Sequence, residues 1–384
     1  MKTGDQTLIK HLNRKIILET IIHHKSISRA QLSKLTGLNK ATITSQIVEL
    51  INDGLVVETV FDKSSGGRKP LLLSLNHCAG YAIGIELDVD CIYIIVTDLS
   101  GRIVNKKYMN VNTSSYERTK KVLCEQIRFI IKNIPVSRYG IVGIGIGIHG
   151  IVDKNEQIVF ATHSNWRNVD LKSELLEEFH LPVHIDNNTN LIASAEKAYY
   201  ADAKNLLCLT VSTGIGLGII IDHEIFRGFN GFAGEVGHMI THIGGLPCSC
   251  GNNGCWEKYA SEQVFLSRLA EIKHIPSCTV EDVQRWVGEK DQESIELFAQ
   301  FSKELAIGLN NIINTFNPET IIINSELIGA YPQIIEDIKR HMVSSMSDYG
   351  NILHSKLGKK ACALGASIEM IKRFLNISQL QLSH

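Results

Sequence analysis

Residues 235–257 read EVGHMITHIGGLPCSCGNNGCWE, the stretch of this 384-residue chain with the most specific chemistry. Its cysteines have the spacing Cys-x-Cys-x4-Cys: Cys248, Cys250 and Cys255. Four glycines allow the backbone to fold back on itself and bring the three thiolates to one point: Gly244, Gly245, Gly251 and Gly254. Either His238 or His242 can supply a fourth ligand, and a Cys3His set without an open position is typical of structural zinc. The stretch therefore predicts a metal-bound loop, with three thiols that hold no metal as the alternative.

Around this loop the sequence alternates short apolar runs with glycines and longer helical segments. The runs from Gly80 onward are typical of buried strands: YAIGIELD, CIYIIVTDLSG, YGIVGIGIGIHG and NLLCLTVSTGIGLGIIID. Helices are expected at 118–133, 171–179 and 295–316, and the last leads into the strand TIIIN. Strands that alternate with helices indicate an α/β fold. Because the order of strand hairpin, helix and glycine-rich strand occurs twice, we expect two related lobes with a cleft between them.

The metal-binding loop also carries a family resemblance. GFAGEVGH, followed by CSCGNNGCWEKYAS, closely resembles the signature of the ROK family of repressors and sugar kinases. The resemblance runs from about Gly80 to the C-terminus and implies a two-lobed actin-like (ribonuclease H-like) domain at 77–384. It implies structural Zn(2+) on four ligands: His238, Cys248, Cys250 and Cys255. It also implies that sugar hydroxyls are held by Glu235, His238 and Glu257, because carboxylates accept hydrogen bonds from neighbouring hydroxyls.

Residues 1–76 predict a winged helix-turn-helix domain in front of this fold. Leu8, Leu12 and Ile16 recur at four-residue spacing with Ile9, Ile17 and Ile21 alongside, which predicts a first helix at 7–23 that buries one face. After the helices, 55–61 and 71–75 read as two strands. They are joined by DKSSGGRKP, which predicts a β-wing with a basic tip. On such a tip Arg68 and Lys69 can enter the minor groove or bind phosphates.

The second and third helices of this region have the pattern of a helix-turn-helix. Ser28 and Gln31 have capping-box spacing, Gly37 allows a sharp turn, and Asn39 can cap the third helix. We expect these side chains to point inward: Leu32, Leu35, Ile43, Ile47 and Leu50. We expect these to face outward, as in a recognition helix: Lys40, Thr42, Thr44, Ser45 and Gln46. The predicted DNA contacts are Arg29, Gln31, Asn39, Lys40, Ala41, Thr42, Thr44, Ser45, Arg68 and Lys69. A three-helix unit with a solvated face is the alternative.

Charge and cysteine usage agree with a cytoplasmic nucleic-acid-binding chain. Residues 1–76 hold 11 Lys and Arg against 6 Asp and Glu. The whole chain has 39 Lys and Arg and 40 Asp and Glu, so the remaining residues hold 28 Lys and Arg against 34 Asp and Glu. A basic front and an acidic remainder suit a small DNA-binding module joined to a larger one. Six of the nine cysteines are scattered among apolar neighbours and are expected to be buried reduced thiols: Cys78, Cys91, Cys124, Cys208, Cys278 and Cys362. The N-terminus lacks the apolar region of a secretory signal, and no run is long enough to cross a bilayer.

Kinases of the ROK family bind ATP through three segments, and this sequence can be compared with each of them. At the first turn the sequence GIELDVD places Glu86, Asp88 and Asp90 where a kinase would receive phosphate, and these negative charges would repel a triphosphate. The second turn, STGIGLG, is kept. The adenosine site reads INSEL at 323–327 and lacks its glycines. The sequence therefore predicts that the chain is not an enzyme.

The stretch HIDNNTN at 184–190 supports the same conclusion. Kinases of the family resemble E-N-D-x-N here, and the aspartate takes a proton from the attacking sugar hydroxyl; in this sequence Asn188 stands in its place. An amide cannot act as a general base at neutral pH, but it can still hydrogen-bond to a hydroxyl. We therefore expect Asn187 and Asn188 to bind the sugar effector without phosphoryl transfer. Asp186 or Asn187 can also cap the helix that follows.

A neighbouring segment, ATHSNWRNVDL, leaves an open question. His163, Asn165 and Trp166 have the composition of a sugar-binding wall, but Trp in an α/β domain is more often part of the core. His149 stands where the family often has proline, which puts the shape of this wall in doubt.

The resemblance implies a repressor of xylose-utilisation genes that binds a palindromic operator as a homodimer and is released by D-xylose. Glucose is a candidate competitor. D-xylose lacks the exocyclic carbon whose hydroxyl a hexose kinase phosphorylates, so an amide suits a site that only recognises it. The alternatives are a ROK sugar kinase with an N-terminal helical appendage, or a ROK repressor that responds to glucose or N-acetylglucosamine.

Overall fold

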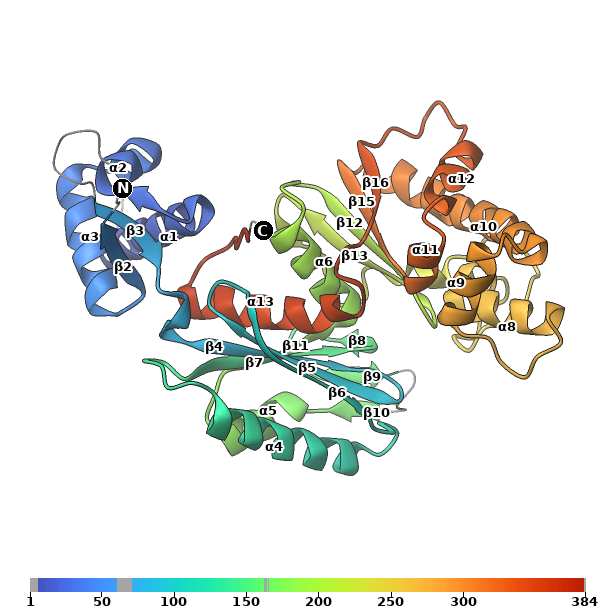
Figure 1. Ribbon diagram of the computed structural model, residues 1–384, viewed down its shortest axis with the longest axis horizontal. Helices are drawn as coiled ribbons and strands as arrows, with labels where there is room; N and C mark the ends of the chain where they lie inside the picture. Colours follow the sequence, from blue (N-terminus) through green and yellow to red (C-terminus); the bar gives the residue numbers. More distant parts are fainter. Residues whose placement is uncertain (1–5, 61–70, 162–163, 165, 383–384) are drawn as a thin grey trace. The chain divides into compact units, whose positions relative to one another are not determined.

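The computed structural model describes residues 6–60, 71–161, 164 and 166–382, and the chain divides into two compact units (Figure 1). The first unit comprises Met1–Asp202 with Cys362–His384, and the second comprises Ala203–Ala361. Both combine strands and helices, as the α/β prediction requires. The predicted domain boundary after residue 76 falls inside the first unit and stays a prediction. Within the described ranges, no helix has both the length and the apolar character needed to cross a membrane.

The N-terminal module (residues 6–75) consists of three helices and a three-stranded sheet in the order β1-β3-β2. In chain order its elements are α1 (Gln6–His24), β1 (Ile27–Ser28), α2 (Arg29–Thr36), α3 (Lys40–Asn52), β2 (Val56–Val60) and β3 (Leu71–Leu75). The capping box of Ser28 and Gln31 is present, and Gly37 adopts a left-handed conformation with φ of 71°. The Asn39 side chain caps α3 by accepting from the Thr42 N–H at 2.8 Å. The stretch between β2 and β3, with Arg68 and Lys69, lies outside the described residues.

Several side-chain predictions for this module are wrong. Four apolar side chains expected to be buried are exposed: Leu8 (57%), Leu12 (49%), Ile16 (40%) and Leu35 (57%). Ile9, also part of the predicted stripe, is 50% exposed. Ile17 and Ile21 are buried as predicted, and with Leu18 and Ile22 they form the buried face of α1 in the second half of the helix. Gln46, expected outside, is only 4% exposed, because positions 43, 46, 47 and 50 share one helix face.

The rest of the first unit is built on a five-stranded sheet with the order β11-β7-β4-β5-β6. Its strands are β4 (Tyr81–Leu87), β5 (Cys91–Asp98), β6 (Ile103–Asn110), β7 (Ile141–Ile148) and β11 (Val183–Asn187). A small second sheet contains β8 (Gly150–Val152), β9 (Ile158–Ala161) and β10 (Trp166–Val169). The helices are α4 (Tyr116–Asn133), α5 (Leu171–Phe179), α6 (Asn188–Tyr199) and α13 (Ala361–Leu375), with a short 3-10 turn at His77–Ala79. In Figure 1, α4 and α5 lie on one side of the large sheet and α13 on the other.

Glycines in the central strands let α13 approach the large sheet closely. A Cβ on Gly84 of β4 would overlap the carbonyl oxygen of Ala363, and a Cβ on Gly145 of β7 would overlap that of Ala366. The glycine-rich run of β7 is therefore explained by packing as well as by strand formation.

The second unit has a five-stranded sheet with the order β14-β13-β12-β15-β16. Its strands are β12 (Leu206–Val211), β13 (Ile215–Ile221), β14 (Glu224–Ile225), β15 (Thr320–Asn324) and β16 (Asn351–His354). Its helices are α7 (Glu257–Ala260), α8 (Glu262–Ile272), α9 (Val280–Gly288), α10 (Gln292–Phe316), α11 (Glu326–Ala330) and α12 (Ile334–His341), with 3-10 turns at Val236–His238 and Gly358–Lys360. The core includes a cluster of aromatic rings from α8 and α10, with Phe265 and Phe298 at 4.5 Å between centroids.

The two large sheets share one layout, as the repeated pattern in the sequence predicts. In each, three strands pair antiparallel in succession, and the first of them pairs parallel with a later strand that in turn pairs parallel with a fifth. Thus β4 and β12 occupy equivalent places at the centre of their sheets.

The core of the N-terminal module is continuous with the C-terminal helix α13 and the residues after it. One apolar cluster contains Ile17 and Ile21 of α1 together with Ile371, Leu375 and Ile377. The Glu19 carboxylate accepts the N–H groups of Ser378 and Gln379 at 2.8 and 3.3 Å. The Tyr139 hydroxyl donates to the carbonyl oxygen of Asp53 at 2.8 Å. The first unit therefore holds the module through side chains as well as through the connecting chain.

A buried carboxylate on α13 predicts a specific sensitivity to acid. Burial raises the pKa of Glu369, but Lys372, at 2.9 Å, with His184 and the Ser194 hydroxyl, outweighs burial and lowers it to about 2. A carboxyl with a lowered pKa stabilises the fold above its ordinary value, and this contribution is lost as pH falls from about 4.5 to about 2. Substitution Glu369→Gln should flatten the dependence of the unfolding free energy on pH in this window by up to about 3 kcal/mol. Urea unfolding at pH 3 and pH 6 measures this, with exposed Glu281→Gln as control; equal slopes for Glu369→Gln and the wild type would contradict it.

The nine cysteines all lie in described parts of the chain and form no disulfide there, which agrees with the prediction of reduced thiols. The expected burial holds for Cys208 and Cys362 but is wrong for the exposed Cys78. Three others are only partly buried: Cys91, Cys124 and Cys278. Apolar neighbours in the sequence do not ensure burial, because side chains next to one another on a strand point to opposite faces.

Candidate effector site, metal cluster and DNA-binding face

The predicted loop of the second unit brings three thiols and one imidazole together. The ligand atoms of four residues all lie within 4.8 Å of one another: His238, Cys248, Cys250 and Cys255. The Sγ atoms of Cys250 and Cys255 are 3.6 Å apart, and Cys248 Sγ is 3.6 Å from His238 Nδ1. A tetrahedral zinc ion, with bonds of about 2.3 Å to sulfur and about 2.0 Å to nitrogen, separates its ligands by roughly 3.5 to 3.8 Å. The dimensions of the cluster therefore fit a tetrahedral metal ion.

The backbone of the loop is folded tightly enough to produce this arrangement. Gly254 has φ of 82°, and a Cβ there would overlap the carbonyl oxygen of His242. Isolated β-bridges join Ile240 to Cys255 and Pro247 to Asn253, so the loop folds back on itself as the glycines predict.

The thiols need a positive partner to act as ligands together. Burial raises the pKa of Cys255 well above its ordinary value, and the neighbouring Cys250 and Cys248 thiols raise it further. Thiolates this close repel one another, so ionisation of all three requires a cation among them. The set of three thiols and one imidazole indicates a metal cation, and the repulsion among the thiolates indicates the same.

His242, the other histidine considered as a ligand, lies outside the cluster. Its ring stacks on Tyr259 with a centroid distance of 3.8 Å, and its Nε2 is 3.6 Å from the Glu304 carboxylate. The described geometry thus selects His238 as the fourth donor.

Two carboxylates flank His238 on different sides of its ring. Nδ1 faces the cysteines and lies 3.7 Å from Glu257 Oε1, whereas Nε2 lies 4.0 Å from Glu235 Oε2. Burial raises the pKa of Glu235, the Glu257 charge adds to this, and His238 opposes it. One ring can thus donate Nδ1 to a metal and leave Nε2 beside a carboxylate that can accept from sugar hydroxyls. The three residues that the resemblance assigns to the sugar are therefore neighbours within the second unit.

In the first unit, the two asparagines predicted to bind sugar have different surroundings. The Asn187 side chain caps α6 by accepting from the Thr189 N–H and hydroxyl at 2.8 and 2.6 Å, and donates to the Gly150 carbonyl at 2.7 Å. Its acceptor oxygen is fully used by the fold, so the capping prediction for Asn187 is confirmed. Asn188 is buried, and its Nδ2 lies 3.2 Å from His149 Nε2. Asn188 is therefore the better placed of the two to meet a ligand.

The structure adds two residues to this position that sequence reasoning did not assign to sugar binding. His149 Nε2 lies 3.3 Å from Glu86 and 3.7 Å from Asp88, and all are close to the ends of β4 and β7. Burial lowers the pKa of His149, but the Glu86 hydrogen bond and the Asp88 and Glu86 charges raise it above its ordinary value. We call Glu86, Asp88, His149 and Asn188 the His149 cluster. The sequence carries a signal for this cluster, since Glu86 lies where a kinase would receive phosphate and His149 stands where the family often has proline.

INSEL stands at the position of a kinase's adenosine site, and its polar side chains form hydrogen bonds within the second unit. Ser325 caps α11 and its hydroxyl donates to Glu262 at 3.1 Å, while Asn324 donates to the Ser355 hydroxyl at 2.9 Å. The turn STGIGLG forms the β12–β13 hairpin, so its glycines are accounted for by the fold.

The segment that left an open question at 161–171 is only partly described. His163 and Asn165 lie outside the described residues. Trp166 is buried and packs edge-on against Tyr116, with centroids 5.2 Å apart. Trp166 is thus a core residue of the first unit.

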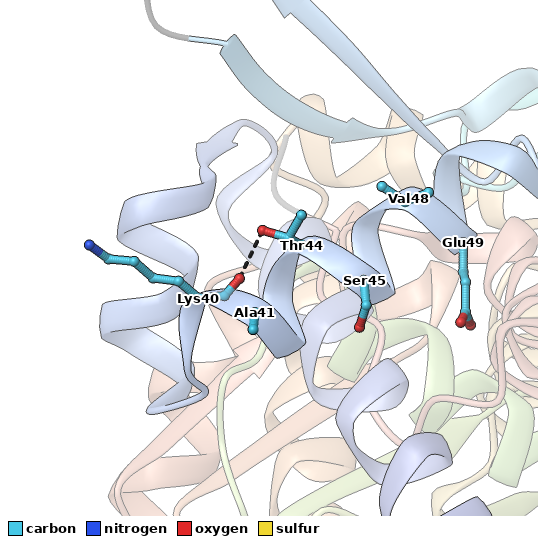
Figure 2. Close-up of a pocket in the computed structure, with 6 residues that line it drawn as sticks. All are labelled: Lys40, Ala41, Thr44, Ser45, Val48 and Glu49. Atoms are coloured by element: carbon cyan, nitrogen blue, oxygen red, sulfur yellow. Dashed lines mark hydrogen bonds between the residues drawn. The ribbon is translucent and has the colours of Figure 1, made fainter.

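The outward residues of α3 line an open pocket, and Figure 2 draws their side chains: Lys40, Ala41, Thr44, Ser45, Val48 and Glu49. Other predicted DNA contacts have structural partners: Arg29 forms an ion pair with Glu58 at 2.7 Å, and Gln31 and Asn39 cap helices. Thr42 is half-buried. The structure therefore brings together Lys40, Ala41, Thr44 and Ser45, and adds Val48, which the sequence did not single out.

The chain has two α/β units of one layout, a loop with a Cys3His cluster and an N-terminal module of three helices and a small sheet. These features define its class: a fold of the sugar-kinase type joined to an N-terminal helical module. The chain belongs to the ROK family, whose sequence model matches residues 82–373. It is 42% identical to a xylose repressor of Bacillus spizizenii, over 99% of this chain and all of that protein, and 41% identical to a xylose repressor of Bacillus subtilis, over 98% and 99%.

Solved structures of the ROK family have the same fold. A ROK family transcriptional regulator, a homologue of the Escherichia coli MLC protein, superposes with a TM-score of 0.80 at 26% identity, covering 97% of this chain and 98% of that one. A ROK family glucokinase of Streptomyces griseus, in complex with glucose and AMPPNP, has a TM-score of 0.68 at 24% identity and covers 75% and 98%. The α/β fold prediction and the family resemblance are both confirmed.

Proposed function

We propose that the chain is a transcriptional repressor of xylose-utilisation genes, which binds operator DNA and releases it when D-xylose binds. The observation that carries this proposal is the 42% identity to a xylose repressor along the whole chain, N-terminal module included. The glucokinase matches only 75% of the chain. The similarity to the xylose repressor therefore includes residues that the match to the glucokinase leaves out.

In this proposal the N-terminal module binds DNA through α3. The chain acts as a homodimer, because two copies of α3 related by a two-fold axis would match the two halves of a palindromic operator. Arg68 and Lys69 supply phosphate or minor-groove contacts, which adds a salt-dependent contribution to affinity. The chain is cytoplasmic in this role, since its DNA is there.

In this proposal the Cys3His cluster holds a structural zinc ion. Zinc bound to these four ligands supplies a rigid crosslink and no reaction chemistry, because no coordination position stays open. His238 Nδ1 and the three thiolates would hold the ion, and this would fix the backbone between Glu235 and Glu257. The metal thereby orients two carboxylates that bind sugar hydroxyls.

Each unit holds side chains that can form hydrogen bonds to D-xylose. Asn188 in the first unit donates and accepts hydrogen bonds, and Glu235, His238 and Glu257 in the second unit accept from or donate to hydroxyls. Asn187 supports this set by capping α6 rather than by touching the sugar.

The chain is a regulator without kinase activity in this proposal. Asn188 cannot take up a proton, and Glu86 and Asp88 place negative charge at the position where a kinase receives phosphate. The amide at Asn188 separates the proposed repressor from a ROK sugar kinase, which is the rival from another class.

Release of DNA by D-xylose is the direct test. A 200-bp fragment upstream of xylose-utilisation genes is expected to form a complex with the purified chain, and D-xylose should weaken it roughly 5- to 150-fold, the usual range of allosteric coupling. A mobility-shift titration with D-xylose, glucose and N-acetylglucosamine measures this. Release by N-acetylglucosamine or glucose alone would contradict the choice of D-xylose, and ADP formation from ATP with any of these sugars would contradict the absence of kinase activity.

A further inference from the structure

We propose that the outward face of α3 reads thymine methyl groups in the major groove, and that Val48 and Ala41 determine this specificity. This inference rests on the proposed DNA-binding function and adds the chemistry of the base contact. The α3 outer face is defined by six residues: Lys40, Ala41, Thr44, Ser45, Val48 and Glu49.

The spacing of these residues places all six on one side of the helix. Positions i, i+1, i+4, i+5, i+8 and i+9 of an α-helix share a face, and the opposite side of α3 is anchored by the fully buried Ile43, Ile47 and Leu50. Because α3 is held on that side and follows the turn at Gly37, the outer face is presented to solvent. Figure 2 shows Lys40 extending away from the helix and Val48 on the same exposed surface.

Hydrogen bonds within α3 use up the hydroxyl protons of the outer face. The Thr44 hydroxyl donates to the Lys40 carbonyl oxygen at 2.8 Å, and the Ser45 hydroxyl donates to the Thr42 carbonyl oxygen at 3.1 Å. Each hydroxyl carries one hydrogen, so both retain only acceptor positions for a ligand. With its hydroxyl turned back to the helix, Thr44 offers its methyl group to the outside (Figure 2).

The charged groups of the α3 outer face also offer few hydrogen bonds to base edges. Glu49 forms an ion pair with Lys10 of α1 at 2.9 Å, so its charge is partly neutralised within the module. Side chains that pair with guanine or adenine through two hydrogen bonds are Arg, Lys, Asn and Gln, and of these the α3 outer face holds Lys40 alone. Gln46, the amide nearest in sequence, is buried. Lys40 remains as the donor, and its charge suits phosphate or the guanine edge.

What this face does offer is apolar surface. Val48 is 44% exposed, Ala41 is exposed, and the Thr44 methyl lies between them. Among the four bases only thymine displays an apolar group in the major groove, its C5 methyl. DNA is favoured over a protein partner as occupant because residues 1–76 carry 11 basic against 6 acidic residues. The match is therefore to A·T pairs whose thymines face Val48 and Ala41.

The test uses uracil in place of thymine, because the two bases differ only in this methyl. The full-length protein first selects duplexes from a random 30-bp library, and each thymine of the enriched duplex is then replaced singly by deoxyuridine. We expect at least one substitution in each half-site to weaken binding about fourfold, the effect of one buried methyl group. With Val48→Ala, one of these positions should no longer distinguish thymine from uracil, whereas Val57→Ala, an exposed valine on β2, should behave as the wild type.

The outcomes separate the inference from the proposed function. Enrichment of a duplex that binds equally well after every substitution overturns the methyl contact and leaves DNA binding intact. A Val48→Ala variant that is folded by thermal melting but loses affinity equally for the thymine and uracil duplexes also overturns it. If no duplex is enriched, the proposed repressor function itself fails.

Discussion

Substitution Cys255→Ser should remove the bound zinc and abolish the response of DNA binding to D-xylose. Cys255 is fully buried and its Sγ lies 3.6 Å from that of Cys250, and the neutral serine hydroxyl that replaces it is not a ligand of structural zinc sites. Structural zinc sites contribute on the order of 10 kcal/mol to the order of the segment that holds them. Without the metal, Glu235 and Glu257 lose their fixed positions on the loop, and the sugar loses its partners.

Metal content per chain and the D-xylose concentration that half-releases the DNA measure this effect. We expect about one zinc per wild-type chain, close to none in Cys255→Ser, and no sugar response in the variant while DNA binding persists. Cys278→Ser, a partly buried cysteine outside the cluster, is the matched control and should retain both. Full zinc content in the Cys255→Ser protein would show that the cluster is not the metal site.

The second large effect is expected from substitution Asn188→Ala. Asn188 is buried beside His149, and in the proposal its amide exchanges hydrogen bonds with a xylose hydroxyl. Loss of a hydrogen bond to a buried group costs about 1–3 kcal/mol, so D-xylose affinity should fall roughly 5- to 150-fold. Operator affinity without sugar should stay close to that of the wild type, since α3 is unchanged.

The neighbouring amide supplies the comparison. Asn187→Ala removes the cap of α6 and should lower the unfolding free energy by about 1 kcal/mol or more, with little change in D-xylose affinity. Calorimetric titration with D-xylose and thermal unfolding of both variants separate the two roles. A weaker xylose affinity in Asn187→Ala than in Asn188→Ala would reverse the assignment.

The elements of the fold were predictable because their signals are local. Alternating apolar runs and glycines indicated the strands, and the predicted helix at 171–179 agrees with α5 at both ends. The capping box of Ser28 and Gln31 and the cap of α3 by Asn39 could be read directly, since a cap depends on side chains within three residues of one another.

Which face of a helix is buried was less predictable. Leu8, Leu12 and Ile16 form an apolar stripe as regular as a buried one, but the neighbours that would cover them are not encoded in α1 itself. Gln46 was placed outside because of its polarity, although its position in the helix aligns it with Ile43 and Leu50. Polarity and periodicity disagreed at this residue, and periodicity decided its burial.

The candidate site also contains one part that local sequence could predict and one part that it could not. The metal ligands lie close in sequence, so their spacing could predict the cluster. The His149 cluster combines residues near the ends of β4 and β7 and the start of α6, and only the parallel pairing of those strands brings them together. Contacts that depend on sheet order cannot be read from spacing alone.

The position of α13 has a mechanical consequence. Its first turn places Cys362 against Gly147 of β7, where burial and the nearby Glu86 and Asp88 raise the thiol pKa, and its last turn contributes Leu375 to the core around α1. The 15 residues of this helix span about 22 Å, and a helix changes length only by breaking hydrogen bonds. α13 is thus a stiff helix with one end beside Gly147 and the His149 cluster and the other end in the core of the N-terminal module. If the proposed effector moves the His149 cluster, a stiff helix would pass that movement to the module with little loss.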